Sequence, residues 1–153
     1  MTGNRYKRPE SVLVVIHTPD LQILMLERAQ HPGYWQSVTG SREDSESFLQ
    51  TAVREVHEET GLQITSEQLH VWPGENVYTI MPEWRHRYAP EVTHNRERVF
   101  SLCLPQPLDI RIAPAEHRTW RWQPWAEAAA ACFSPSNRDA ILALAKPRHA
   151  TTR

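Results

Sequence analysis

Glu55, Glu58 and Glu59 fall within two turns of what the local pattern predicts to be one helix. Carboxylates at helical spacing repel one another, and each like-charged pair costs about 0.2–0.5 kcal/mol. A hard divalent cation relieves this repulsion, and magnesium in proteins is held by few carboxylates together with waters and substrate phosphates. The three glutamates therefore indicate a metal site that acts on phosphate groups.

A helical wheel at about 100° per residue separates the three glutamates. The apolar face consists of Phe48, Leu49, Ala52, Val53, Val56 and Thr60. Glu55 and Glu59 lie about 40° apart at one border of this face, whereas Glu58 points to solvent, four residues after Arg54. We expect Glu55 and Glu59 to be inner metal ligands and Glu58 to be an outer or second-metal ligand. The alternative is a solvated acidic helix face.

The same segment carries signals for a loop followed by a helix. Ser47 with Gln50 three residues later fits a capping box, and Gly61 fits a left-handed helix stop. The sequence predicts a helix over 48–60, preceded by a polar loop that begins at Gly40. Helix starts expose free N–H groups, so this loop is a suitable place for phosphates.

The residues from 40 to 62 resemble the signature of the Nudix hydrolase superfamily at every specified position. These positions are Gly40, Glu46, Arg54, Glu55, Val56, Glu58, Glu59, Gly61 and Leu62. The resemblance implies an α/β protein, an α/β/α sandwich with a mixed β-sheet, and hydrolysis of nucleoside diphosphate derivatives with Mg²⁺ or Mn²⁺. Many members carry Gly where Ser45 stands, which predicts mild strain if that site needs a positive φ.

A wider set of motifs resembles one group within that superfamily, the bacterial dihydroneopterin triphosphate pyrophosphohydrolases. The set comprises Tyr6–Pro9, Val12–Ile16, Trp35–Ser41, Arg85–Pro90, Ala115–His117 and Ser136–Arg138. The Ser37-Val38-Thr39 version replaces the Pro-Gly-Gly type of turn that most superfamily members have. This resemblance implies Mg²⁺-dependent hydrolysis of dihydroneopterin triphosphate to the monophosphate and pyrophosphate, a step in folate synthesis.

Three other functions stay open at this point. A broader pyrophosphohydrolase for nucleoside triphosphates such as dATP would use the same signature. An RNA 5′ pyrophosphohydrolase is disfavoured, because no basic stripe follows a nucleic acid backbone. A binding module on an inactive scaffold is disfavoured by the intact set of glutamates.

Candidate substrate-binding residues are Lys7, Arg28, Thr39, Arg85 and Ser134. Lys7 and Arg28 are cations near the first strands, and a triphosphate needs charge compensation beyond the metal. Thr39 precedes the polar loop, and Arg85 belongs to a basic and aromatic loop. Ser134 is assigned by the resemblance alone.

Glu116 is a candidate from outside the signature. A lone Glu in a loop is ordinarily a surface residue, but the resemblance implies a further carboxylate that serves as metal ligand or general base. The sequence leaves ligation and proton abstraction equally open. The predicted catalytic residues are thus Glu58, Glu59 and Glu116, and the predicted metal ligands are Glu55, Glu58, Glu59 and Glu116.

The whole chain of 153 residues predicts one domain over 1–146, followed by a disordered tail over 147–153. A formal charge of −1 gives no electrostatic footprint for nucleic acid or a membrane surface. The N-terminal MTGNRYKRPE has no apolar signal region. We expect a cytoplasmic protein with a small-molecule substrate, with Cys103 and Cys132 as buried free thiols; the oligomeric state is not readable.

The elements that position these residues follow from periodicity and turn signals. We expect strands over Ser11–Ile16, Gln22–Leu26, Trp35–Val38, Asn76–Met81, Arg98–Leu104 and Arg118–Trp122, the first two as a hairpin. Two late helices are expected over Pro124–Cys132 and Asn137–Ala145, the second capped by Ser136.

Overall fold

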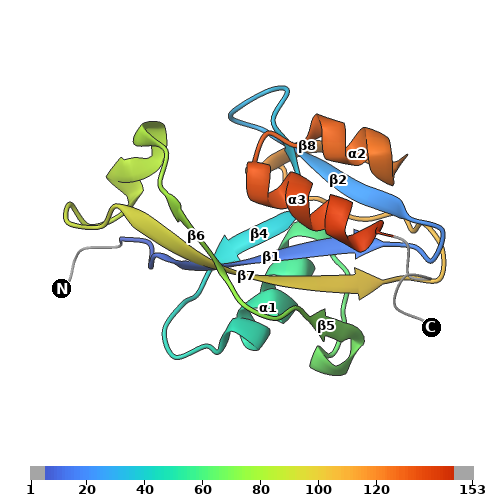
Figure 1. Ribbon diagram of the computed structural model, residues 1–153, viewed down its shortest axis with the longest axis horizontal. Helices are drawn as coiled ribbons and strands as arrows, with labels where there is room; N and C mark the ends of the chain where they lie inside the picture. The colour runs from blue at the N-terminus through green and yellow to red at the C-terminus, as the bar shows by residue number, and fades with distance from the viewer. Residues whose placement is uncertain (1–5, 147–153) are drawn as a thin grey trace.

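The computed structural model describes residues 6–146, which form a mixed β-sheet with helices on both faces (Figure 1). The strands are β1 (Glu10–His17), β2 (Gln22–Arg28), β3 (Trp35–Gln36), β4 (Val38–Ser41), β5 (Leu69–Val71), β6 (Asn76–Thr79), β7 (His94–Cys103) and β8 (His117–Pro124). The helices are α1 (Phe48–Thr60), α2 (Trp125–Ala131) and α3 (Pro135–Leu144), with short 3₁₀ turns η1 (Ser66–Gln68) and η2 (Pro82–Arg87). The predicted α/β/α sandwich is confirmed. The predicted tail over 147–153 lies outside the described residues.

Strand β1 organises the sheet. It runs parallel to β7 along its whole length and antiparallel to β4 over Ser11–Val14. Only its end, at His17, pairs with β2, which continues alongside β8. The predicted hairpin of β1 and β2 is therefore present. Because β4 and β2 occupy different halves of the same edge of β1, the sheet splits between them, and this split positions the site.

Alternation along β1 produces two apolar cores. Val12, Val14 and Ile16 join the buried cluster shared with α1, whereas Leu13 and Val15 join the cluster shared with α2 and α3. Side chains of successive strand residues point to opposite faces. A continuous apolar run is therefore what a strand covered by helices on both faces requires.

Helix α1 has the predicted bounds and both predicted end signals. Ser47 and Gln50 form the reciprocal capping box, and Gly61 adopts a left-handed conformation with φ 78°. The positive φ in the preceding loop belongs to Asp44, at 49°, and not to Ser45. Asp tolerates this conformation better than most residues, so Ser45 carries no such strain.

Several predicted boundaries differ from the structure. The strand expected over 35–38 is interrupted at Ser37, and β5 was not predicted. Helix α3 begins at Pro135 and its cap is Ser134, not Ser136. Proline suits the first helical position, because the N–H that it lacks would have no partner there.

The expectation of two buried thiols is wrong for Cys103. Cys103 is exposed and Cys132 is partly buried, and both are free. Cys103 is the last residue of β7, and its side chain points to the face opposite the buried cluster that holds Leu102. No helix within residues 6–146 is long and apolar enough to cross a membrane.

Candidate functional site

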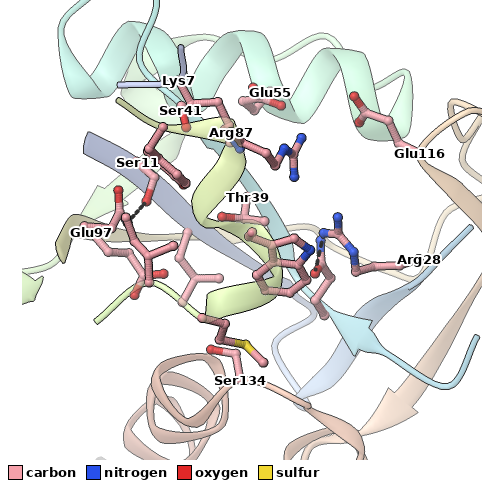
Figure 2. A pocket seen from close by; sticks show the side chains of 18 of the residues that line it. Lys7, Ser11, Arg28, Thr39, Ser41, Glu55, Arg87, Glu97, Glu116 and Ser134 are labelled. Carbon is pink, nitrogen blue, oxygen red and sulfur yellow. Dashed lines mark hydrogen bonds between the residues drawn. The ribbon is translucent and has the colours of Figure 1, made fainter. Parts of the chain in front are cut away.

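A large cavity of about 1380 Å³ lies at the split of the sheet. Its lining comes from the N-terminal segment, β1, β2, β4, α1, η2, β6, β7, the turn before β8 and the start of α3. Figure 2 shows Glu55 and Glu116 on one side of this cavity and Glu97 and Ser134 on others, with Thr39 and Arg87 between them. Residues far apart in the sequence therefore meet in one site.

Glu55 and Glu59 are buried in the wall of this cavity, with 8% and 3% of their surface exposed. Burial raises the pKa of Glu55 to about 7. The pKa of Glu59 is raised well above its usual range by burial and by the nearby charge of Glu55. Gly40 permits this packing, because a Cβ atom there would lie 2.0 Å from the Glu55 carboxyl carbon. The predicted border position of both glutamates thus corresponds to burial beside β4.

The carboxylate pair fits a divalent cation. Oε1 of Glu59 is buried and has no hydrogen-bond partner among the described residues. Burial and mutual repulsion disfavour the ionised form of both carboxyls, and a hard cation bound between them would stabilise that ionised form. Within residues 6–146, no three His, Cys, Asp or Glu side chains form a ready-made cage. A cation held here would depend on substrate phosphates and waters for its other ligands, as magnesium commonly does.

Glu58 and Glu116 lie farther out than this pair. Glu58 has a half-exposed side chain and accepts a hydrogen bond of 3.2 Å from Nη1 of Arg54. Glu116 is exposed in the turn before β8, and it lines the cavity. The ion pair predicted for Glu58 is present, whereas the catalytic and metal-binding roles of both residues remain predictions.

Arg54 connects the carboxylates to the loop before α1. Its Nη1 lies 3.0 Å from Oε2 of Glu55, and its Nη2 donates to Oε1 of Glu46 and to the carbonyl of Ser41, both at 3.0 Å. The hydrogen bonds from Arg54 lower the pKa of Glu46 to about 2. Nε of Arg54 also donates to Oε2 of Glu46, which completes a bidentate pair of defined geometry. Arg54 therefore sets the position of both the loop and Glu55.

The cations Lys7, Arg28 and Arg87 line the same cavity. Burial, followed by repulsion from Arg87, lowers the pKa of Lys7 to about 8. Burial is also the main cause that lowers the pKa of Arg28, whose Nε has no partner among the described residues. Three cations that line one cavity with the Glu55 and Glu59 carboxylates suit the binding of a polyphosphate.

Of the other predicted contacts, Thr39 and Ser134 line the cavity and Arg85 does not. Thr39 donates its hydroxyl to the Val12 carbonyl at 2.8 Å, while Ser134 caps α3. Arg85 reaches instead toward the Val92 carbonyl, at 3.4 Å. With three residues per turn in a 3₁₀ helix, positions 84 and 87 share a side and position 85 does not. Arg87 is therefore the cation that η2 directs into the cavity.

Sequence reasoning also missed a group of polar residues at the far end of the cavity. This group consists of Ser11, Tyr78, Asn95 and Glu97, from β1, β6 and β7. The sequence carries no signal here, because residues 94–98 are all polar and lack the apolar pattern by which strands are recognised. The predicted strand began only at Arg98, and no element was predicted over 94–97.

The chain is similar over most of its length to known proteins. The family model described as NUDIX domain matches residues 7–144. The dihydroneopterin triphosphate diphosphatase of Escherichia coli (strain K12) is 45% identical over 144 residues, covering 92% of this chain and 95% of that protein. The protein of the same name from Haemophilus influenzae is 38% identical, covering 90% and 87%.

A solved structure shows the same relationship in three dimensions. The structure of the E. coli dihydroneopterin triphosphate pyrophosphohydrolase matches with a TM-score of 0.83 and 44% identity, covering 90% of this chain and 95% of that one. The family model spans nearly all the described residues, including the loop and helix that carry Glu55 and Glu59. This chain therefore belongs to the Nudix family.

Proposed function

We propose that this protein hydrolyses dihydroneopterin triphosphate to dihydroneopterin monophosphate and pyrophosphate, with Mg²⁺ as its cation. The observation that carries the proposal is the buried pair Glu55 and Glu59, which shares one cavity with Lys7, Arg28 and Arg87. The relatives from Escherichia coli and Haemophilus influenzae are both named for this activity.

Each group of residues in the cavity would have a separate role in this reaction. Glu55 and Glu59 would hold the cation, which when bound neutralises phosphate charge and lowers the pKa of water. Lys7, Arg28 and Arg87 would bind the phosphate oxygens and offset the charge of the departing pyrophosphate. Glu116 enters the cavity from the side of Figure 2 opposite Glu97, and would serve as general base or further ligand.

The alternative substrate is a nucleoside triphosphate such as dATP. The carboxylates and the cations recognise metal and phosphate, and these are common to both substrate classes. Discrimination must therefore come from the part of the cavity that receives the ring.

The test is pyrophosphate release with MgCl₂, comparing dihydroneopterin triphosphate, GTP and dATP at equal low concentration. We expect kcat/KM to favour the pterin by about 100-fold or more, and EDTA to abolish activity. Glu59→Gln should lower kcat by roughly 10²–10⁴-fold, because its amide cannot replace an anionic ligand. Glu67→Gln, an exposed residue of η1, is the matched control and should retain activity. Equal or faster turnover of dATP by the unaltered protein would refute the pterin assignment.

A further inference from the structure

The far end of the cavity has a polar wall, which we call the polar floor: Ser11, Tyr78, Asn95 and Glu97. Figure 2 shows Glu97 and Ser11 across the cavity from Glu116, with Thr39 and Arg87 between the two ends. A triphosphate held at the carboxylate end would place the other part of its molecule toward this floor. The polar floor takes no part in the proposed hydrolysis.

Asn95 leaves an acceptor unused in the polar floor. Its Nδ2 donates to Oγ of Ser11 at 2.7 Å and to the hydroxyl of Tyr78 at 3.0 Å. Its Oδ1 is buried without a partner among the described residues, and the side chain is only 1% exposed. A buried acceptor without a donor costs stability, so this oxygen indicates a ligand N–H.

Glu97 supplies further acceptors beside Asn95. It is 3% exposed, and its Oε1 accepts a hydrogen bond of 3.1 Å from Nδ2 of Asn76. Unlike Glu46 and Glu55, which pair with Arg54, Glu97 forms no ion pair with any residue in the range 6–146. A carboxylate has about four acceptor positions, so Glu97 can accept additional hydrogen bonds from a ligand in the cavity.

The alternation of β7 directs both side chains to one face. Asn95 and Glu97 are two residues apart, and Glu97 pairs with Ser11 in the parallel register of β1 and β7. This face also packs against the start of α3, and Ser136 from that helix hydrogen-bonds Glu97. The acceptors are thus held by three elements, and their positions are fixed before a ligand arrives.

We infer that the polar floor binds the 2-amino-4-oxopyrimidine edge of the substrate ring, with Glu97 accepting hydrogen bonds from the 2-amino group and the adjacent ring N–H. The inference rests on the proposed function only for placing the phosphates at the carboxylate end. Asn95 Oδ1 would accept a hydrogen bond from the remaining N–H of the 2-amino group, or from the O–H of an ordered water beside it.

This pairing predicts which rings are excluded. Pterin and guanine both present an amino group next to a ring N–H, which are two donors for one carboxylate. Adenine presents an amino group next to a ring nitrogen that carries a lone pair, and this lone pair would face the Glu97 carboxylate. Sites built to hydrogen-bond a donor discriminate strongly against analogues that lack it.

The experiment removes the 2-amino group from the ligand and the carboxylate from the protein. GTP and inosine triphosphate differ only in that amino group, and Glu97→Gln is nearly isosteric. Each pair is compared by kcat/KM, or by the inhibition constant against dihydroneopterin triphosphate. In the unaltered protein we expect GTP to be favoured by roughly 30-fold or more. In Glu97→Gln we expect that preference to fall below about 3-fold, whereas Glu67→Gln should keep it.

Two results would overturn the inference. One is equal use of GTP and inosine triphosphate by the unaltered protein, a comparison that needs no folded variant. The other is an undiminished preference in a folded Glu97→Gln protein. The proposed function is tested separately, by comparing dihydroneopterin triphosphate with dATP in the unaltered protein. If dATP were used as well as the pterin while GTP was still preferred to inosine triphosphate, the inference about the polar floor would stand and only the pterin substrate would be refuted.

Discussion

At the scale of single residues, Glu55 and Glu59 destabilise the folded protein when they are ionised, although the proposed activity needs them in that form. Both have pKa values raised by burial, Glu55 to about 7. The folded state therefore binds more protons than the unfolded state from about pH 4.5 upward. The free energy of unfolding must therefore fall as pH rises from about 4.5 through about 7, because the folded protein then loses the protons that these two carboxyls hold.

We predict that metal-free protein loses more stability between pH 5 and 7.5 than the double variant Glu55→Gln with Glu59→Gln. The difference should be on the order of 3 kcal/mol, because one pKa unit corresponds to about 1.4 kcal/mol. Urea unfolding in EDTA measures it. Burial lowers the pKa of His117 to about 4, so His117 makes the free energy of unfolding rise with pH. This effect is the same in both proteins and cancels when their pH curves are subtracted.

Added MgCl₂ supplies the counterpart of this measurement. At pH 7.5 it should stabilise the unaltered protein, since a ligand of the folded state shifts the unfolding equilibrium, and it should leave the double variant unchanged. If the free energy of unfolding changed with pH in the same way in both metal-free proteins, ionisation of Glu55 and Glu59 would not be the cause of the loss of stability.

At the scale of elements, α3 is fastened to the junction between β3 and β4 by one side chain. Asn137 is buried, and its Oδ1 accepts a hydrogen bond of 2.7 Å from the backbone N–H of Ser37. Its Nδ2 donates to Oγ of Ser37 at 3.0 Å. The Ser-Val-Thr turn and the Ser-Asn-Arg motif, both part of the same resemblance, are therefore the two sides of one contact.

We predict that Asn137→Leu lowers the free energy of unfolding by about 2–4 kcal/mol. The substitution keeps the branching and the number of side-chain heavy atoms, but it removes both hydrogen bonds and leaves the Ser37 N–H buried without an acceptor. Urea unfolding of Arg138→Ala, a change at the next and exposed position of α3, is the control and should differ by less than about 0.5 kcal/mol. A Leu variant as stable as that control would show that the contact is dispensable.

At the scale of the whole molecule, the cavity is completed by segments that meet only in the folded chain. The backbone N–H of Lys7 donates to the Arg87 carbonyl at 2.8 Å, which ties the N-terminal segment to η2. The Trp84 ring lies 5.1 Å from the Arg28 guanidinium and edge-on to Phe133 at 5.7 Å. Figure 1 shows the segment between β6 and β7 projecting from the sheet on the same side as the N-terminal segment.

We predict that Trp84→Ala raises KM by about 3–30-fold with a smaller change in kcat. The loss of the ring frees the Arg28 side chain, and a cation–π contact contributes about 0.5–2 kcal/mol. Steady-state kinetics with dihydroneopterin triphosphate measure this. Trp125→Ala, at the exposed start of α2, is the control and should leave KM unchanged. A fall of about 3–30-fold in kcat without a change in KM would contradict this prediction and indicate that Trp84 acts in the chemical step.

Most of the strands and the whole of α1 could be predicted from the residues alone. Helix caps and the apolar stripe act over a few residues, so they specify the bounds 48–60 and the border positions of Glu55 and Glu59 without any partner. The resemblance in the signature added the family, and with it the expectation of a sandwich with a mixed sheet.

The far end of the cavity and the contacts of η2 depended on the tertiary structure. Asn95 and Glu97 face the cavity because β7 pairs with β1 in one register, and a shift by one residue would turn both away. Arg87 replaces Arg85 as the cavity cation because a 3₁₀ turn orients them differently. Local signals specify what a segment forms, whereas long-range pairing specifies which side chains meet, and the site of this protein depends on both.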